Sequence, residues 1–99
     1  MAKRKTIVKR KHIRYKPIEA VTAEISLENK KSPFKSDLVG LVFSESYDGC
    51  GIVMLISEAV QVGLQCVARV GKLSPLNAEV AWRTEIDPHV IKVGLKYLE

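Results

Sequence analysis

Hydrophobic and polar residues alternate in short segments along most of the chain, and turn-forming residues interrupt the pattern every 8 to 12 residues or so. These segments are rich in β-branched residues, which favour strands over helices. A period of two places successive apolar side chains on one face of a strand. The pattern predicts six strands, over residues 18–27, 38–43, 52–56, 64–70, 78–83 and 91–97.

Four of these segments carry a clear apolar face. Its predicted members are Val21, Ala23, Ile25 and Leu27; then Cys66, Ala68 and Val70; then Ala78, Val80 and Trp82; and last Ile91, Val93, Leu95 and Tyr97. Turns are predicted over residues 44–51 and at Asp87-Pro88, and one short helical turn over residues 57–63.

The length of 99 residues and mass of 11.0 kDa allow one domain with a single core. Six short antiparallel strands must protect their edges, and closure into a barrel does this most completely in a chain of this size. We therefore expect an all-β, six-stranded antiparallel barrel. The last predicted strand ends near Glu99, so any C-terminal helix must be very short or absent.

Positive charge is concentrated at the start of the chain. Residues 1–16 hold eight of the 16 basic residues and none of the 11 acidic ones, which leaves a net charge of −3 in the rest. Pro17 disfavours a helical residue before it. We interpret residues 1–16 as an extended or loosely ordered basic arm and residues 17–99 as the barrel. A solvated tail that merely aids solubility is the alternative.

Several functional classes lack their residues. His12 and His89 stand alone, without a paired nucleophile, base or metal-ligand partner, so we expect a binding protein and no enzyme. The spacing of Cys50 and Cys66 indicates neither a disulfide framework nor a zinc site. No apolar run has the roughly 18 residues that a membrane span needs. A cytoplasmic protein with reduced cysteines and no membrane insertion is expected.

Two short motifs stand out when they are considered together. Arg10 and Arg14 form an RxxxR spacing in the arm, and residues 44–51 read SESYDGCG between the second and third predicted strands. Each motif alone is weak evidence, because basic segments often contain RxxxR and hairpins often use Asp-Gly for its easy access to positive φ.

In this order the two motifs resemble those of the bacterial PilZ domain, a six-stranded barrel family that binds the second messenger cyclic di-GMP through RxxxR followed by [D/N]xSxxG. The resemblance covers about residues 9–98 and includes the closing segment 93–97. Ser46 and Gly49 match the serine and glycine of the second motif. Ser44 departs from it, because a hydroxyl stands where the family has a carboxylate or amide.

The resemblance implies a ligand site formed by Arg10, Arg14, Ser44, Ser46 and Gly49, with Lys9 beside it, and no other cofactor. The arginine forks would grip phosphate or the O6/N7 edge of guanine and stack on its ring. Replacing a charged acceptor by Ser44 is expected to cost on the order of 1 kcal/mol, or about fivefold to tenfold in affinity. Asp48 is interpreted as a turn residue and Trp82 as barrel packing.

The implied function is a receptor whose arm docks on the barrel when the ligand binds and so signals to an unidentified effector protein. Motility, exopolysaccharide production and virulence control are typical outputs of the family. Two alternatives stay open. One is a PilZ-like adaptor that binds no nucleotide, as in type IV pilus assembly, and Ser44 supports it. The other is a small barrel that binds nucleic acid through its arm, which the scarcity of aromatic residues, 6% of the chain, makes unlikely.

Overall fold

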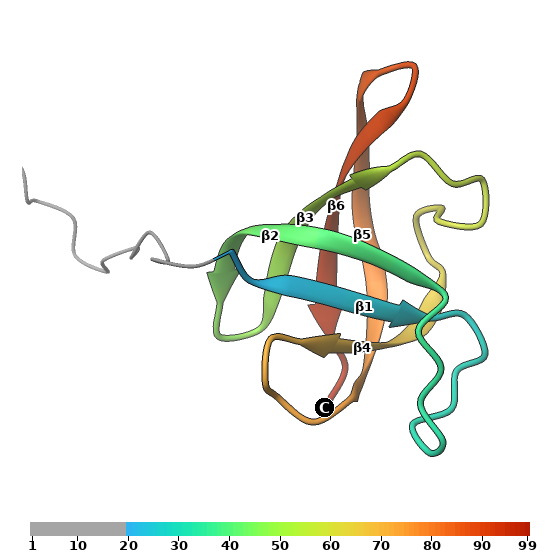
Figure 1. The fold of residues 1–99 in the computed structure, drawn as a ribbon, viewed down its shortest axis with the longest axis vertical. Helices are drawn as coiled ribbons and strands as arrows, with labels where there is room; N and C mark the ends of the chain where they lie inside the picture. The colour runs from blue at the N-terminus through green and yellow to red at the C-terminus, as the bar shows by residue number, and fades with distance from the viewer. Residues whose placement is uncertain (1–19) are drawn as a thin grey trace, which may run out of the picture.

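Alternating segments of this kind pair edge to edge, and in the computed structural model, which describes residues 20–99, they close into one antiparallel barrel (Figure 1). The strands are β1 (Thr22–Ser26), β2 (Leu38–Ser46), β3 (Gly49–Leu55), β4 (Gln65–Val70), β5 (Leu76–Asp87) and β6 (Val90–Tyr97). Their order around the barrel is β1-β2-β3-β6-β5-β4, and β1 pairs with β4 to close it. The predicted fold class is confirmed.

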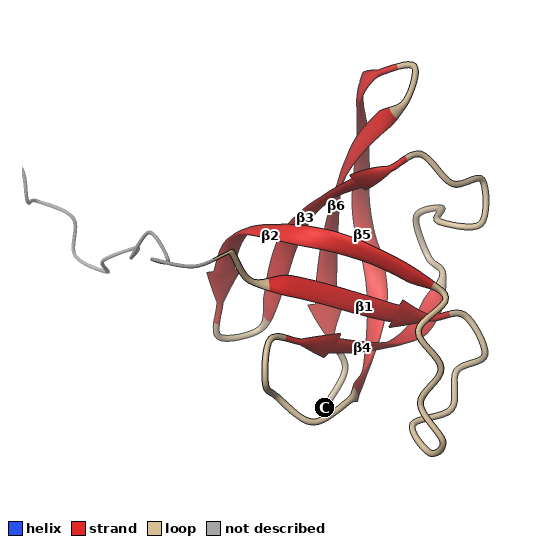
Figure 2. Cartoon of the chain, viewed as in Figure 1, coloured by secondary structure: helices blue, strands red, loops and turns tan. Residues whose placement is uncertain are grey.

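Loops connect the strands, and residues 20–99 contain no helix (Figure 2). In particular, this part of the chain has no helix with the length and apolar character that crossing a membrane requires. The residues that precede Ala20, including the predicted arm, lie outside the described residues.

The predicted apolar faces line the barrel interior almost as expected. Their fully or almost fully buried members are Ala23, Ile25, Cys66, Ala68, Val70, Ala78, Val80, Ile91, Val93 and Leu95, joined by Cys50, Ile52 and Met54 of β3. Val60, from the loop between β3 and β4, is also buried in this core. Side chains fill the interior of a barrel this narrow. Another molecule therefore meets the outer surface and the ends of the barrel.

Two local predictions are wrong. Residues 44–51 do not form a turn, because β2 extends to Ser46 and β3 begins at Gly49, which leaves only Tyr47 and Asp48 between them. The strands continue this far since β6 pairs with the other side of β3 over its whole length. Residues 57–63 form turns without a helix, because the Gly63 amide donates to the carbonyl of Val80, at 2.8 Å.

The predicted turn at Asp87-Pro88 is confirmed. The Asp87 carboxylate accepts hydrogen bonds from the backbone amides of His89, at 2.7 Å, and Val90, at 2.9 Å. An aspartate that bonds to the backbone two or three residues further on mimics a backbone turn and ends the strand.

The position of Trp82 differs from the prediction. Val80 pairs with Leu95 and Trp82 pairs with Gly94, so β5 has one residue more than β6 between these two pairs. This bulge at Ala81 breaks the period of two. Val80 is buried, whereas Trp82 turns to the outer surface and is 43% exposed. The tryptophan packs on the barrel wall and is not part of the core.

Burial of Cys66 makes the stability of the barrel sensitive to alkaline pH. The apolar surroundings raise the pKa of its thiol from 9.0 to about 11, because they disfavour the thiolate. A pKa that is higher in the folded state contributes stability below pH 9, and this contribution is lost between pH 9 and about 11. We expect a loss on the order of 2 kcal/mol from this group. Urea unfolding as a function of pH should show it, and Cys66→Ala should flatten the slope; an unchanged slope in the variant would contradict the assignment.

Candidate ligand-binding groove

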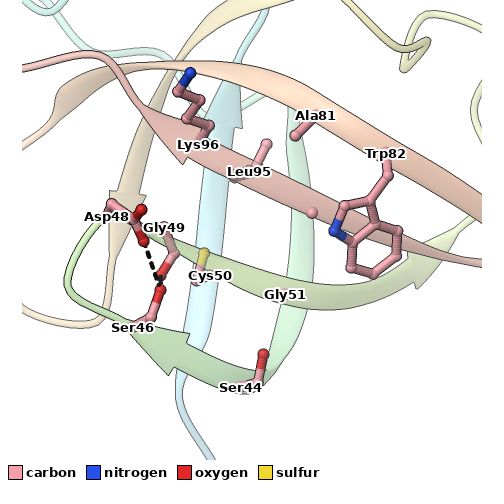
Figure 3. Close-up of a pocket in the computed structure, with 11 residues that line it drawn as sticks. Ser44, Ser46, Asp48, Gly49, Cys50, Gly51, Ala81, Trp82, Leu95 and Lys96 are labelled. Atoms are coloured by element: carbon pink, nitrogen blue, oxygen red, sulfur yellow. Dashed lines mark hydrogen bonds between the residues drawn. The ribbon is translucent and has the colours of Figure 1, made fainter.

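A shallow groove crosses the outer surface of β2, β3, β6 and β5. Its middle is one cross-strand row, in which Ser44 pairs with Gly51, Gly51 with Gly94, and Gly94 with Trp82. Two neighbouring glycines remove the side chains from the centre of this row, so that backbone forms the floor. The groove has a volume of about 330 Å³. It is lined by Ser44, Ser46, Asp48, Gly49, Cys50, Gly51, Ala81, Trp82, Gly94, Leu95 and Lys96 (Figure 3).

Aromatic side chains explain why the floor must be glycine. The indole of Trp82 lies across Gly94, and a Cβ at position 94 would overlap its Nε1 atom. A Cβ at position 51 would lie 2.6 Å from Cζ of Phe43 and 3.0 Å from Oγ of Ser44. Any larger residue at either position would have to displace an aromatic ring. The two rings therefore cover the glycines, which are both buried, and the exposed part of the Trp82 indole is the aromatic surface that the groove presents.

Hydroxyl and carboxylate groups line the other end of the groove, at the hairpin between β2 and β3 (Figure 3). The Ser46 hydroxyl donates toward Asp48 Oδ1, at 3.0 Å, and toward the carbonyl oxygen of Gly49, at 3.2 Å. The hairpin thus occupies its proton, and its lone pairs are left to accept. Ser44 lies two residues back on β2 with its hydroxyl beside the floor.

Gly49 allows β6 to pass close to the start of β3, a role that the motif does not predict. Its backbone does not have a positive φ; among residues 20–99 only Gly63 and Gly71 are glycines of that kind. A Cβ at position 49 would instead overlap the carbonyl oxygen of Leu95 on β6. Glycine is required here because the neighbouring strand passes close by, and this contact also fixes the hairpin that carries Ser46 and Asp48.

Charged side chains of both signs lie at this end of the groove. Asp48 supplies an anion that can accept hydrogen bonds, and Lys96 of β6 supplies a cation that can attract a phosphate.

The thiol of Cys50, which also lines the groove, ionises less readily than an exposed thiol. Burial raises its pKa, a hydrogen bond with Tyr97 partly opposes this, and the charge of Glu45 raises it further. The thiol is therefore neutral at physiological pH. Residues 20–99 contain no group of three or more side chains able to hold a metal ion.

The predicted site residues fall into two groups. Ser44, Ser46 and Gly49 line the same groove, whereas Lys9, Arg10 and Arg14 lie outside the described residues.

The described part of the chain begins beside β2, the strand that carries Ser44. The amide of Val42 donates to the carbonyl of Val21, at 2.8 Å, so that the start of the chain runs beside β2 two residues before Ser44. Ala20 and Glu45 also line one hollow.

Sequence reasoning missed three groove residues. The alternation pattern predicts Trp82 as a packing residue, because nothing in the sequence marks the bulge at Ala81. The Asp-Gly pair predicts only a turn role for Asp48, which also lines the groove, and no motif in the sequence marks Lys96. Lys96 pairs with Gly49 across two strands that are far apart in the sequence, so the contact depends on the barrel register.

Comparison of the chain with protein-family models, with curated protein sequences and with solved structures gives no match. The function is therefore inferred from the chemistry of the groove and from the motifs that lie in and before it.

The floor of the groove can be tested through Trp82, which is the single tryptophan of the chain. A methyl group in Gly94→Ala must push the indole off the barrel wall and into solvent, which should red-shift its fluorescence and destabilise the fold by about 1–3 kcal/mol. Gly63→Ala is the control, because a Cβ there meets no atom within 4 Å. It should leave the emission unchanged despite its backbone strain. Identical spectra for Gly94→Ala and the wild type would show that the indole lies elsewhere.

Proposed function

We propose that the protein is a cyclic di-GMP receptor of the PilZ type, which binds the dinucleotide between the groove and the basic N-terminal segment. The observation that carries this proposal is the meeting of Ser44, Ser46 and Gly49 with Trp82 in one groove. The path of the chain supports it too. Arg14 precedes Ala20 by six residues, and six extended residues span up to about 20 Å. The arginines are thus within reach of the groove.

Each part of the groove suits a part of the ligand. The exposed indole of Trp82 offers a face on which a guanine can stack, a contact worth about 1–3 kcal/mol for a base. Because the Trp82 and Phe43 rings cover Gly94 and Gly51, a flat ligand ring would meet the outer face of the indole and not the backbone. Lys96 can attract a phosphate. Arg10 and Arg14 supply the bidentate forks for phosphate or the O6/N7 edge of guanine.

Asp48 reduces the importance of the departure at Ser44. The N1 and N2 groups of guanine are donors and need an acceptor, for which a carboxylate is better than a hydroxyl. The family pattern has this acceptor at the position of Ser44. Asp48 lines the same groove from the two-residue turn between β2 and β3, where its carboxylate accepts a hydrogen bond from Ser46 at 3.0 Å. We propose that Asp48 accepts from the guanine edge in place of residue 44.

Ligand binding would act as a switch. The groove has about 330 Å³, at the lower end of the range for ligand pockets. It holds one guanine and adjacent phosphate, and the rest of the dinucleotide is left for the N-terminal segment to cover. Docking of that segment changes the surface that a partner meets, which is how a small receptor of this kind signals to an effector protein in the cytoplasm.

The receptor proposal predicts binding that depends on the two arginines. Calorimetric titration of the full chain with cyclic di-GMP should give micromolar or tighter binding, which quenches Trp82 fluorescence as the guanine stacks. Arg10→Ala and Arg14→Ala should each weaken it by about tenfold or more, since each removes a charged, bidentate contact. Lys30→Ala is the control, because Lys30 is exposed in the loop between β1 and β2 and lines neither the groove nor the hollow beside Ala20. Absence of binding at tens of micromolar ligand would reject the receptor.

The acceptor role of Asp48 predicts a pattern across two positions. Asp48→Asn keeps the shape but loses the charge, and should weaken binding by about fivefold to tenfold. Ser44→Asp should regain that factor in the Asp48→Asn background, because it restores the family's acceptor. Calorimetry on the four proteins of this cycle gives the coupling directly. Additive effects at the two positions would mean that they do not serve the same donor.

The nucleotide-free adaptor is the second candidate, and the hydroxyl at Ser44 favours it. It predicts that Ser44→Asp creates no binding of cyclic di-GMP in any background. Nucleic-acid binding through the basic segment has weaker support, because Trp82 is the one aromatic residue that lines the groove and single-strand binding surfaces use several. It predicts binding of arbitrary oligonucleotides with a steep dependence on salt.

A further inference from the structure

A second feature of the outer surface adjoins the groove at Phe43. The outward positions of β2 and β3 form an apolar face that consists of Val39, Leu41, Phe43, Val53 and Leu55. Leu41 and Val53 pair across the two strands. Leu55 is 74% exposed, Val39 55%, Leu41 53% and Phe43 46%. Contiguous apolar surface of this kind is uncommon on monomers and marks a place where another molecule packs.

Strand pairing cannot explain this face. Both sides of β2 are paired, with β1 and with β3, and both sides of β3 are paired, with β2 and with β6. β1 pairs with β2 over residues 38–41, and in this part of β2 and along all of β3 no backbone edge is left to accept an added strand. The partner must therefore pack face to face through side chains, as two sheets do in a sandwich.

Charges border the face on two opposite sides. On the β1 side, Glu24 pairs in register with Val39, and on the β6 side Lys92 pairs in register with Val53. Within residues 20–99 Lys92 makes no ion pair, and its ammonium group lies over the ring of Phe43, 5.0 Å from the ring centre. Glu24 is ion-paired with Arg69: its Oε1 accepts from Nε of Arg69 at 2.7 Å and also contacts Nη2, which leaves Oε2 to accept from another group.

This pattern of charge is complementary to itself. We propose that the apolar face is the interface of a homodimer, with a twofold axis that runs parallel to β2 and β3 between the copies. Such an axis places the β6 side of one copy over the β1 side of the other. Lys92 of each copy then meets Glu24 of its partner, one pair on either side of an apolar centre. A twofold axis across the strands would place Lys92 against Lys92 and is disfavoured.

Sedimentation velocity of the full chain without nucleotide tests the interface. The wild type should shift from monomer to dimer between low-micromolar and sub-millimolar concentration. Leu41→Lys and Leu55→Lys each place two unpaired charges in the centre of the contact, and each should weaken dimerisation by about tenfold or more. Val62→Lys is the matched control, because Val62 is 62% exposed in the loop between β3 and β4 and is not one of the five residues of this face. It should dimerise like the wild type.

The border charges decide the orientation. Lys92→Glu should weaken dimerisation by repelling Glu24 of the other copy, whereas Lys72→Glu, with the same change of net charge elsewhere, should not. Circular dichroism confirms that each variant is folded. A wild type that stays monomeric at sub-millimolar concentration overturns the proposal, and so does a dimer that persists in Leu41→Lys. The proposal is also overturned if added salt abolishes association while Leu41→Lys leaves it unchanged. Association of that kind would be electrostatic and due to the basic segment, not to the apolar face.

Discussion

Val80 of β5 pairs with Leu95 of β6. Next to this pair, two residues of β5, Ala81 and Trp82, lie opposite the single residue Gly94 of β6. This added residue turns the largest side chain of the strand from the core to the outer surface, where it finds room because Gly94 has no side chain. The same row continues through Gly51 to Ser44. The bulge and the two glycines thus place an aromatic ring and a polar rim along one row of the outer surface.

The barrel separates packing from binding. The inward residues of all six strands form one core. That surface carries two distinct features. The groove is polar at the end of the β2–β3 hairpin, where Asp48 and Lys96 lie, and the apolar face covers the opposite part of the same two strands. Phe43 lies between them, since it contacts the floor at Gly51 and forms part of the apolar face.

A dimer through the apolar face would leave the polar end of the groove outside the centre of the interface. Nucleotide binding and self-association would then be separable by mutation, although Phe43 connects them physically. A shift of the Phe43 ring changes its packing against Gly51 on one side and its contact with the ammonium group of Lys92 on the other. The two proposals stand on different residues, and failure of one leaves the other intact.

The sequence by itself determined the strand number, the inward faces and the barrel, because these follow from local alternation and from the need to bury strand edges. It also marked Ser44, Ser46 and Gly49 as a group, since they are close along the chain. Only the tertiary structure decided which residues face them. Gly94 and Lys96 reach the groove through the register of β3 with β6, whose paired residues are more than 30 positions apart in sequence. Trp82 reaches it through the register of the β5–β6 hairpin and its one bulge between Val80 and Trp82. No local pattern encodes that register.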